Sequence, residues 1–195
     1  IAGTEAPEAG ASFEVFLKSA GSYDAAAESE RDILTCGENG TAQSKLLPYG
    51  VYIVRQLSGW KGYALDATLH EVNITSDGET VSLPLRNEIY KGSLTIQKID
   101  KDSGQALPGA RFRLLDSTGN PFAKGTTDEN GILFFENIPF GDYYLEELEA
   151  PDGYKADTTP YVFSIDADGR KIEIRRENTR IPGSVTVVKT DSSGS

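Results

Sequence analysis

The chain repeats itself at an offset of 91 residues, and this repeat sets the size of the folding unit. Residues 35–63 align without a gap on residues 126–154, and ten of the 29 positions are identical. At the same offset, GSLTIQKID at 92–100 falls on GSVTVVKTD at 183–191. A period near 90 residues is too long for a solenoid repeat and fits a small autonomous domain. The sequence therefore predicts a tandem array of small domains.

The repeat divides the 195 residues into three parts. Residues 1–90 are expected to form a domain that lacks its first strand, residues 91–181 a complete domain, and residues 182–195 the first strand of a following domain. The chain does not begin with methionine, its first residues IAGTEAPEAG show no signal-peptide pattern, and it ends in the polar KTDSSGS. We therefore expect it to be a piece of a longer protein.

Within each repeat the pattern is that of short β-strands. Runs such as ARFRLLD, GILFFENI, DYYLEEL and PYVFSID are rich in β-branched and aromatic residues. Turn sequences such as STGN, DENG and DADG separate them. Short strands at a spacing of about ten residues predict an all-β fold, either a sandwich or a small barrel.

Composition narrows the classes of function. The formal net charge of −11 argues against binding to nucleic acid or to an anionic membrane surface. No stretch approaches the ~20 apolar residues that cross a bilayer, so no membrane insertion is expected in this fragment. The single cysteine excludes a disulfide within the chain. One histidine and scattered acidic turns give no pattern for a metal, and no cofactor is expected.

Strand periodicity places three polar side chains on core faces. Alternate side chains of a strand share a face, so Lys98 points inward with Leu94 and Ile96. By the same rule Glu147 points inward in YYLEEL, and Asn178 points inward in the last strand of the repeat. Three strands thus direct a lysine, a glutamate and an asparagine into one apolar interior.

Burial gives these groups a chemistry of their own. A lysine among aliphatic side chains loses its proton readily, and the neutral amine is a nucleophile. A buried carboxyl group that stays protonated can polarise an amide. Attack of Lys98 on Asn178, with proton transfer through Glu147, would expel ammonia and leave an isopeptide bond. An ordinary ion pair, with the lysine reaching toward solvent, is the simpler alternative.

The pattern resembles the CnaB-type, SpaA-like (prealbumin-like) domains of Gram-positive cell-surface adhesins and pilins. The segments GDYYLEELEAPDGY and KID carry the resemblance, which covers nearly the whole chain as tandem copies. It implies tandem immunoglobulin-like β-sandwiches of the reverse type and an isopeptide bond between Lys98 and Asn178, assisted by Glu147. It also implies an extracellular, cell-wall-anchored protein whose anchor lies outside this fragment. Arg176 departs from the pattern, because an apolar residue is expected beside Asn178.

The first repeat departs further. Gln56 stands where the second repeat has Glu147, and glutamine cannot transfer a proton as a carboxyl group does. Asn87 keeps the position of Asn178, but the position of the lysine falls before Ile1. This degenerate site is therefore expected to lack a cross-link in this chain.

Lys189 is the counterpart of Lys98 in the incomplete third repeat. Intermolecular strand addition of residues 183–191 to the first domain would complete that sandwich and bring Lys189 to Asn87. The other expected partners are the neighbouring domains of the same chain.

The sequence thus favours a structural stalk or spacer module that is not an enzyme. The alternative is a ligand-binding adhesin module that recognises a host-surface protein or glycan. Two features could mark such a site, namely Trp60 and an eight-residue insertion between Gly10 and Thr35 of the first repeat. A hydrolase is the weakest hypothesis, because no paired catalytic set converges outside the lysine, glutamate and asparagine.

Overall fold

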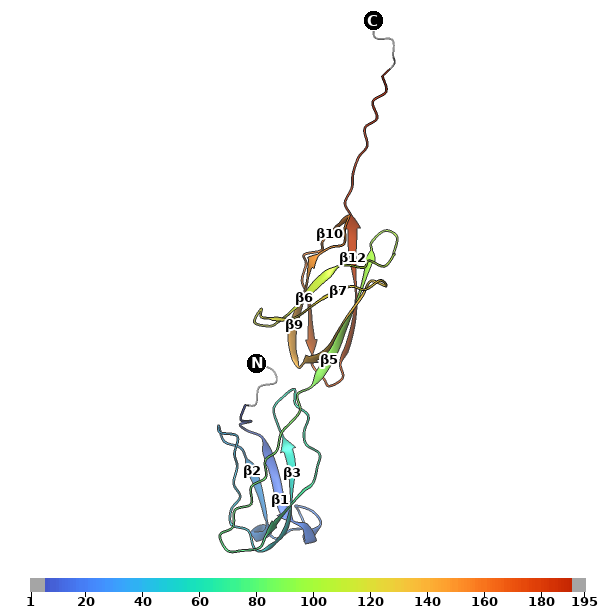
Figure 1. The fold of residues 1–195 in the computed structure, drawn as a ribbon. Coiled ribbons are helices and arrows are strands. Elements are labelled where there is room, and N and C mark those ends of the chain that lie inside the picture. Colours follow the sequence, from blue (N-terminus) through green and yellow to red (C-terminus); the bar gives the residue numbers. More distant parts are fainter. Residues whose placement is uncertain (1–5, 191–195) are drawn as a thin grey trace. The chain divides into compact units, whose positions relative to one another are not determined.

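The computed structural model describes residues 6–190 (Figure 1). The chain divides into two compact units, the first built mainly from residues up to Ser93 and the second mainly from those that follow. Apart from the 3₁₀ turns η1 (Lys18–Ala20) and η2 (Glu28–Glu30), every regular element described is a β-strand. This confirms the all-β prediction. The outermost parts of the predicted domains, residues 1–5 and 191–195, lie outside the described residues.

The second unit is a β-sandwich of two four-stranded sheets. One sheet has the order β10-β12-β5-β8 and the other the order β11-β9-β6-β7. The strands are β5 (Lys91–Asp100), β6 (Arg111–Asp116), β7 (Pro121–Thr126), β8 (Ile132–Pro139), β9 (Gly141–Glu149), β10 (Tyr154–Lys155), β11 (Tyr161–Ile165) and β12 (Lys171–Arg180). Inward residues of both sheets, among them Leu94, Phe112, Leu114, Ile138 and Ile165, are almost completely buried and form the core.

Strand β5 is the strand on which its sheet depends. It lies between β12 and β8, so it supplies hydrogen-bond partners to both. The Lys98 amide donates to the Gly131 carbonyl at 2.7 Å, and the Lys101 amide donates to the Asn178 carbonyl at 3.0 Å. Residues of β5 with the parity of Lys98 are fully buried, because this face of the strand packs against the opposite sheet.

The first unit contains one antiparallel sheet with the order β2-β1-β3-β4. Its strands are β1 (Ser12–Leu17), β2 (Arg31–Thr35), β3 (Gly50–Ser58) and β4 (His70–Ile74). Each is the repeat counterpart of one strand of the β11-β9-β6-β7 sheet. Val15 of β1 lies opposite Val54 of β3, and these two residues form the centre of the core with Tyr52.

The counterpart of the other sheet is not formed in the described part of the first unit. Residues 41–48 and 80–88 correspond to β8 and β12, but neither segment is a strand, and no strand precedes β1 in residues 6–11. Among the described residues neither segment forms a ladder, but the end of the second one still pairs: the Ala64 amide donates to the Glu88 carbonyl at 2.8 Å, and Tyr63 forms an isolated bridge with Ile89. Leu47 and Leu83 of these segments still pack on the core, but they are only partly buried.

No helix among residues 6–190 is both long enough and apolar enough to cross a membrane.

The core of the second unit should respond strongly to truncation. Leu114 is fully buried on β6, whereas Leu148 on β9 is 38% exposed. We expect Leu114→Ala to lower the free energy of unfolding by about 2–5 kcal/mol, because it leaves a cavity. Leu148→Ala should change it by about 0.5 kcal/mol or less. Urea unfolding of both variants tests this, and equal losses would contradict the assignment of the core.

Candidate cross-linking site

Three polar side chains meet inside the second unit. Lys98 of β5, Glu147 of β9 and Asn178 of β12 are 0%, 6% and 2% exposed. Lys98 Nζ donates to Glu147 Oε2 at 2.9 Å and also to Asn178 Oδ1. Asn178 Nδ2 donates to Glu147 Oε1 at 2.7 Å. Each side chain therefore contacts the other two, and the carboxylate touches both the amine and the amide.

The surroundings of Lys98 shift the pKa of its side chain downward. Burial lowers the pKa of the Lys98 ammonium, and the hydrogen bond and charge of Glu147 oppose this only in part. The Phe112 ring lies on one side of Nζ, with its centroid 5.6 Å away. The Lys98 amine is thus buried and close to an amide, and its lowered pKa makes the neutral, nucleophilic form easier to reach.

A second layer of contacts holds the carboxylate in place. The Asp157 amide donates to Glu147 Oε2 at 3.0 Å. The Asp157 carboxylate in turn accepts from the Arg176 guanidinium at 2.7 Å, and the same guanidinium donates to the Thr159 carbonyl. Arg176 therefore has a role that the expectation of an apolar residue missed. It fixes the segment that positions Glu147, and β12 keeps its regular path.

Asp100 is a buried carboxylate that the sequence analysis did not single out. It accepts from the amides of Asp102 and Ser103, from the Tyr154 hydroxyl at 2.7 Å and from Arg180 Nε at 2.6 Å. These bonds, that of the Ser103 amide foremost, hold the pKa of Asp100 well below its usual range. The signal was present in KID, where the aspartate follows Lys98 by two residues on the same face. Asp100 ties the end of β5 to β10 and β12.

The first unit places Gln56 and Asn87 differently. Gln56 is buried, but its Oε1 accepts from the Asp66 amide at 2.8 Å and its Nε2 donates to the Ser58 carbonyl. Asn87 Nδ2 donates instead to Glu8 Oε2 at 3.0 Å. Glu8 was not predicted, because it lies outside every strand and has no periodic pattern.

Lys189 lies in the exposed segment 181–190, which forms no strand and continues from β12 (Figure 1). Asp191, the last residue of the predicted strand, lies outside the described residues.

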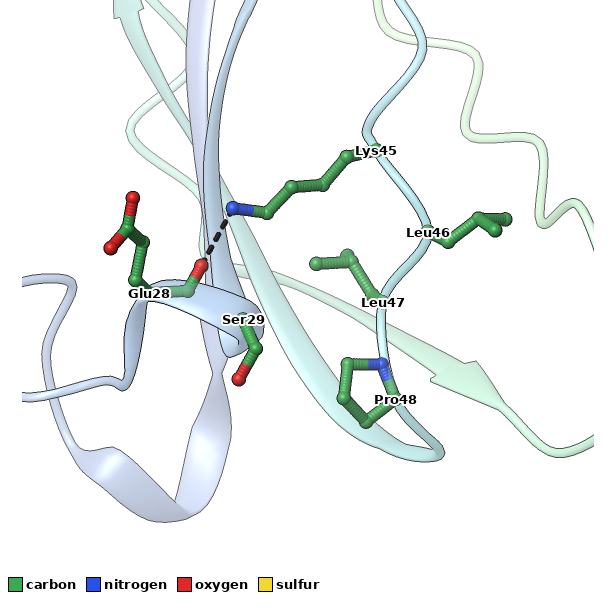
Figure 2. A pocket seen from close by; sticks show the side chains of 6 residues that line it. All are labelled: Glu28, Ser29, Lys45, Leu46, Leu47 and Pro48. Atoms are coloured by element: carbon green, nitrogen blue, oxygen red, sulfur yellow. Dashed lines mark hydrogen bonds between the residues drawn. The ribbon is translucent and has the colours of Figure 1, made fainter.

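The hollow beside the insertion of the first unit has few groups that could bind a ligand. A surface hollow of the first unit is lined by Glu28, Ser29 and residues 45–48 (Figure 2). Lys45 Nζ donates to the Glu28 carbonyl at 2.6 Å, while Leu46 points away and is 92% exposed. No set of charged groups converges on this hollow in Figure 2.

Trp60 is bound into the first unit by its own contacts. Its ring packs edge-to-face on Tyr63 with centroids 6.1 Å apart, and its Nε1 donates to the Ala9 carbonyl at 2.8 Å. In residues 6–190 no group of three His, Cys, Asp or Glu side chains is arranged to hold a metal ion.

The β-sandwich of the second unit and the repeated sheet of the first describe a tandem of related β-domains. Comparison with known proteins identifies these domains as prealbumin-like. The family model described as the SpaA prealbumin-like fold domain matches residues 2–89 and again residues 92–180. The chain belongs to this family. The Bacillus anthracis TIE protein has a similar structure, with a TM-score of 0.77 and 31% identity over 92% of this chain and 32% of that one.

Two curated relatives are cell-surface proteins by name. A collagen adhesin of Staphylococcus aureus is 30% identical over 102 residues, which are 49% of this chain and 8% of that protein. The trypsin-resistant surface T6 protein of Streptococcus pyogenes serotype M6 is 32% identical over 73 residues, 37% of this chain and 14% of that protein. The chain thus spans a small part of the length of either relative.

Acid should test the network around Asp100. Because the folded pKa lies below the unfolded value of about 3.9, the stabilisation is complete above that value and is lost as the pH falls through the folded pKa. Asp100→Asn should lower the Tm at neutral pH and flatten its fall between about pH 5 and pH 2. Asp152→Asn, at an exposed turn, is the control. Parallel acid profiles for Asp100→Asn and the unaltered chain would contradict this role.

Proposed function

We propose that the chain is a stalk module of a Gram-positive cell-surface adhesin or pilin, cross-linked in its second unit by an isopeptide bond between Lys98 and Asn178. The observation that supports it is the three-way contact of a buried amine, a buried amide and a carboxylate. The names of the relatives, a collagen adhesin and a surface protein, support an extracellular, wall-attached parent. Residues 1–90 and 91–181 are then successive domains, and residues 182–195 open the next.

The geometry suits a single reaction that happens once in each folded molecule. The neutral Nζ of Lys98 attacks Cγ of Asn178. Glu147 accepts a proton from the attacking nitrogen and delivers it to Nδ2, so the C–Nδ2 bond breaks and ammonia leaves while the C–Nζ bond forms. Glu147 bonds both nitrogens, which is what a proton carrier between them requires. Folding supplies the proximity that makes the attack effectively unimolecular.

The bond would have a mechanical purpose. It joins β5, the first strand of the second unit, to β12, its last strand, across 80 positions of sequence. Tension applied through the chain would then pass from the first strand to the last along a covalent path. A module without disulfides gains in this way the constraint that a disulfide provides.

The mass of the denatured chain is the direct test. The unaltered chain should weigh one ammonia less than its sequence, and both Lys98→Ala and Glu147→Gln should show their full sequence mass. Lys101→Ala, which removes an exposed lysine three residues away, should retain the deficit. If the unaltered chain shows its full sequence mass, Lys98 forms only a buried ion pair with Glu147, and the proposal is overturned.

Stability gives an independent test. In the chain-entropy model, a link that closes a loop of this size contributes about 4 kcal/mol. Glu147→Gln keeps the lysine and the asparagine but should prevent the bond, so the free energy of unfolding of the second unit should fall by at least about that amount. Glu149→Gln removes only an exposed ion pair with Arg111 and should cost about 1 kcal/mol or less. Similar losses in the two variants would contradict a covalent link.

A further inference from the structure

The carboxylate of Glu147 faces two different nitrogen atoms, so its orientation matters for the proposed reaction. Its Oε2 accepts from Lys98 Nζ at 2.9 Å, and its Oε1 accepts from Asn178 Nδ2 at 2.7 Å. Both contacts change during the reaction, because one nitrogen forms a bond to carbon and the other leaves as ammonia. The terminal torsion of a glutamate side chain is also broad. A contact from outside the reacting groups is therefore required to keep the carboxylate in place.

The turn at residues 157–159 supplies such a contact. The Asp157 amide donates to Glu147 Oε2 at 3.0 Å. The Thr159 amide donates to Asp157 Oδ1 at 3.0 Å, which closes the turn in the way that aspartate side chains commonly do. The Asp157 amide belongs to the backbone and takes no part in the reaction, so it can hold the carboxylate throughout bond formation.

Arg176 ties this turn to the strand that carries the asparagine. Its Nη2 donates to Asp157 Oδ2 and to the Thr159 carbonyl, both at 2.7 Å. Arg176 and Asn178 are two residues apart on β12, so they share a face of the strand. The side chains of Arg176 and Asp157 are 15% and 36% exposed, so their ion pair is partly shielded from water. One arginine thus fixes the turn that orients the acid relative to the strand that carries the amide.

The first unit shows which part of this arrangement is general. At the offset of 91 residues, Asp66 and Thr68 correspond to Asp157 and Thr159. The Asp66 amide donates to Gln56 Oε1 at 2.8 Å, and the Thr68 amide donates to Asp66 Oδ1 at 2.9 Å. The turn and its contact with the neighbouring side chain are therefore the same in both units, whether that side chain is a glutamine or a glutamate.

The group that anchors the turn differs between the units. In the first unit His70 Nε2 lies 2.6 Å from Asp66 Oδ2, and Leu85 stands at the position of Arg176. The arginine thus occurs in the unit that carries Glu147. Since a histidine suffices to hold the turn, a permanently charged guanidinium beside the reacting groups points to an additional, electrostatic effect.

The ion pair acts on the amine through its charges. Glu147 of β9, Arg176 of β12 and Asp157 of the turn are the charged groups that act on Lys98 Nζ, and the Phe112 ring of β6 covers one side of it. Burial is the main cause of the lowered pKa of Lys98, and Glu147 opposes it. Beyond these, the charge of Arg176 lowers that pKa and the charge of Asp157 raises it. Removing one member of the pair should therefore act in the opposite direction from removing the other.

We propose that Arg176 and Asp157 are positioning residues of the cross-linking reaction, which set the rate at which the amine couples to Asn178 by orienting the Glu147 carboxylate and placing opposite charges beside the amine. Neither residue forms or breaks a bond. Lys98 Nζ attacks Asn178 Cγ, Glu147 carries the proton to Nδ2, and ammonia leaves. This inference rests on the function proposed above. It predicts that changes at the pair alter the rate and its pH dependence but not the product.

The rate is measured on full chain that has not yet reacted. Chain recovered from insoluble aggregates in urea should have its sequence mass at time zero, and after dilution into native buffer the loss of ammonia is followed by mass spectrometry of acid-quenched samples. We expect Arg176→Gln to react about 10-fold to 100-fold more slowly than the unaltered chain at pH 7 and still to reach the full mass deficit. Arg175→Gln, which removes a 60% exposed arginine of the same strand, is the matched control and should react at the unaltered rate.

The pH dependence of the rate separates positioning from a general loss of structure. The rate should rise with pH as Lys98 loses its proton. The midpoint of this rise should move to higher pH in Arg176→Gln, which loses a positive charge, and to lower pH in Asp157→Asn, which loses a negative charge. The double variant should have a midpoint between those of the single variants. Arg176→Lys keeps the charge and should keep the unaltered midpoint.

The outcomes distinguish this inference from the function on which it rests. Unaltered rates in both single variants, or slower coupling with unmoved midpoints, would overturn the inference, while a full deficit in the unaltered chain would leave the proposed function standing. If Arg176→Gln does not refold, as judged by circular dichroism, the downward shift in Asp157→Asn decides, because asparagine keeps an oxygen for the Thr159 amide. An unaltered chain that never loses ammonia would refute both.

Discussion

The position of β5 between β12 and β8 is the constraint on which the sandwich depends. A central strand satisfies backbone groups of two neighbours at once. In the second unit β5 does this for β12 and β8. In the described part of the first unit, residues 41–48 and 80–88, which align with β8 and β12, are not strands. The remaining sheet, β2-β1-β3-β4, holds together through its own hairpins and core.

The same strand carries Lys98 of the candidate cross-linking site. Keeping a fully buried amine charged costs free energy. The Glu147 carboxylate and the Asn178 amide oxygen, both at hydrogen-bond distance from Lys98 Nζ, offset part of this cost. That arrangement forms only when β5, β9 and β12 have all packed, because each contributes one group. The three-way contact therefore requires the packed sandwich.

Sequence periodicity predicted much of this, and its failures have physical causes. The inward direction of Lys98 and Glu147 follows from alternation within one strand, which is a local property. The ion pair of Arg176 with Asp157 joins two separate segments. Strand periodicity describes one segment at a time, so it predicted an apolar residue at position 176. The irregular backbone of residues 41–48 and 80–88 was not predicted from the repeat, because strand formation there depends on hydrogen bonds between segments, which no single segment encodes.

Glu8 illustrates a more general limit of reasoning by alignment. Gln56 occupies the aligned position of Glu147, and alignment alone marks the first site as degenerate. What the proposed chemistry requires, however, is a carboxyl oxygen beside the asparagine amide, whichever backbone segment supplies it. Glu8 meets that requirement at 3.0 Å from Asn87. Because a side chain can be replaced in space by one from a different segment, a repeat with glutamine at this position should be judged by its three-dimensional contacts before it is called inactive.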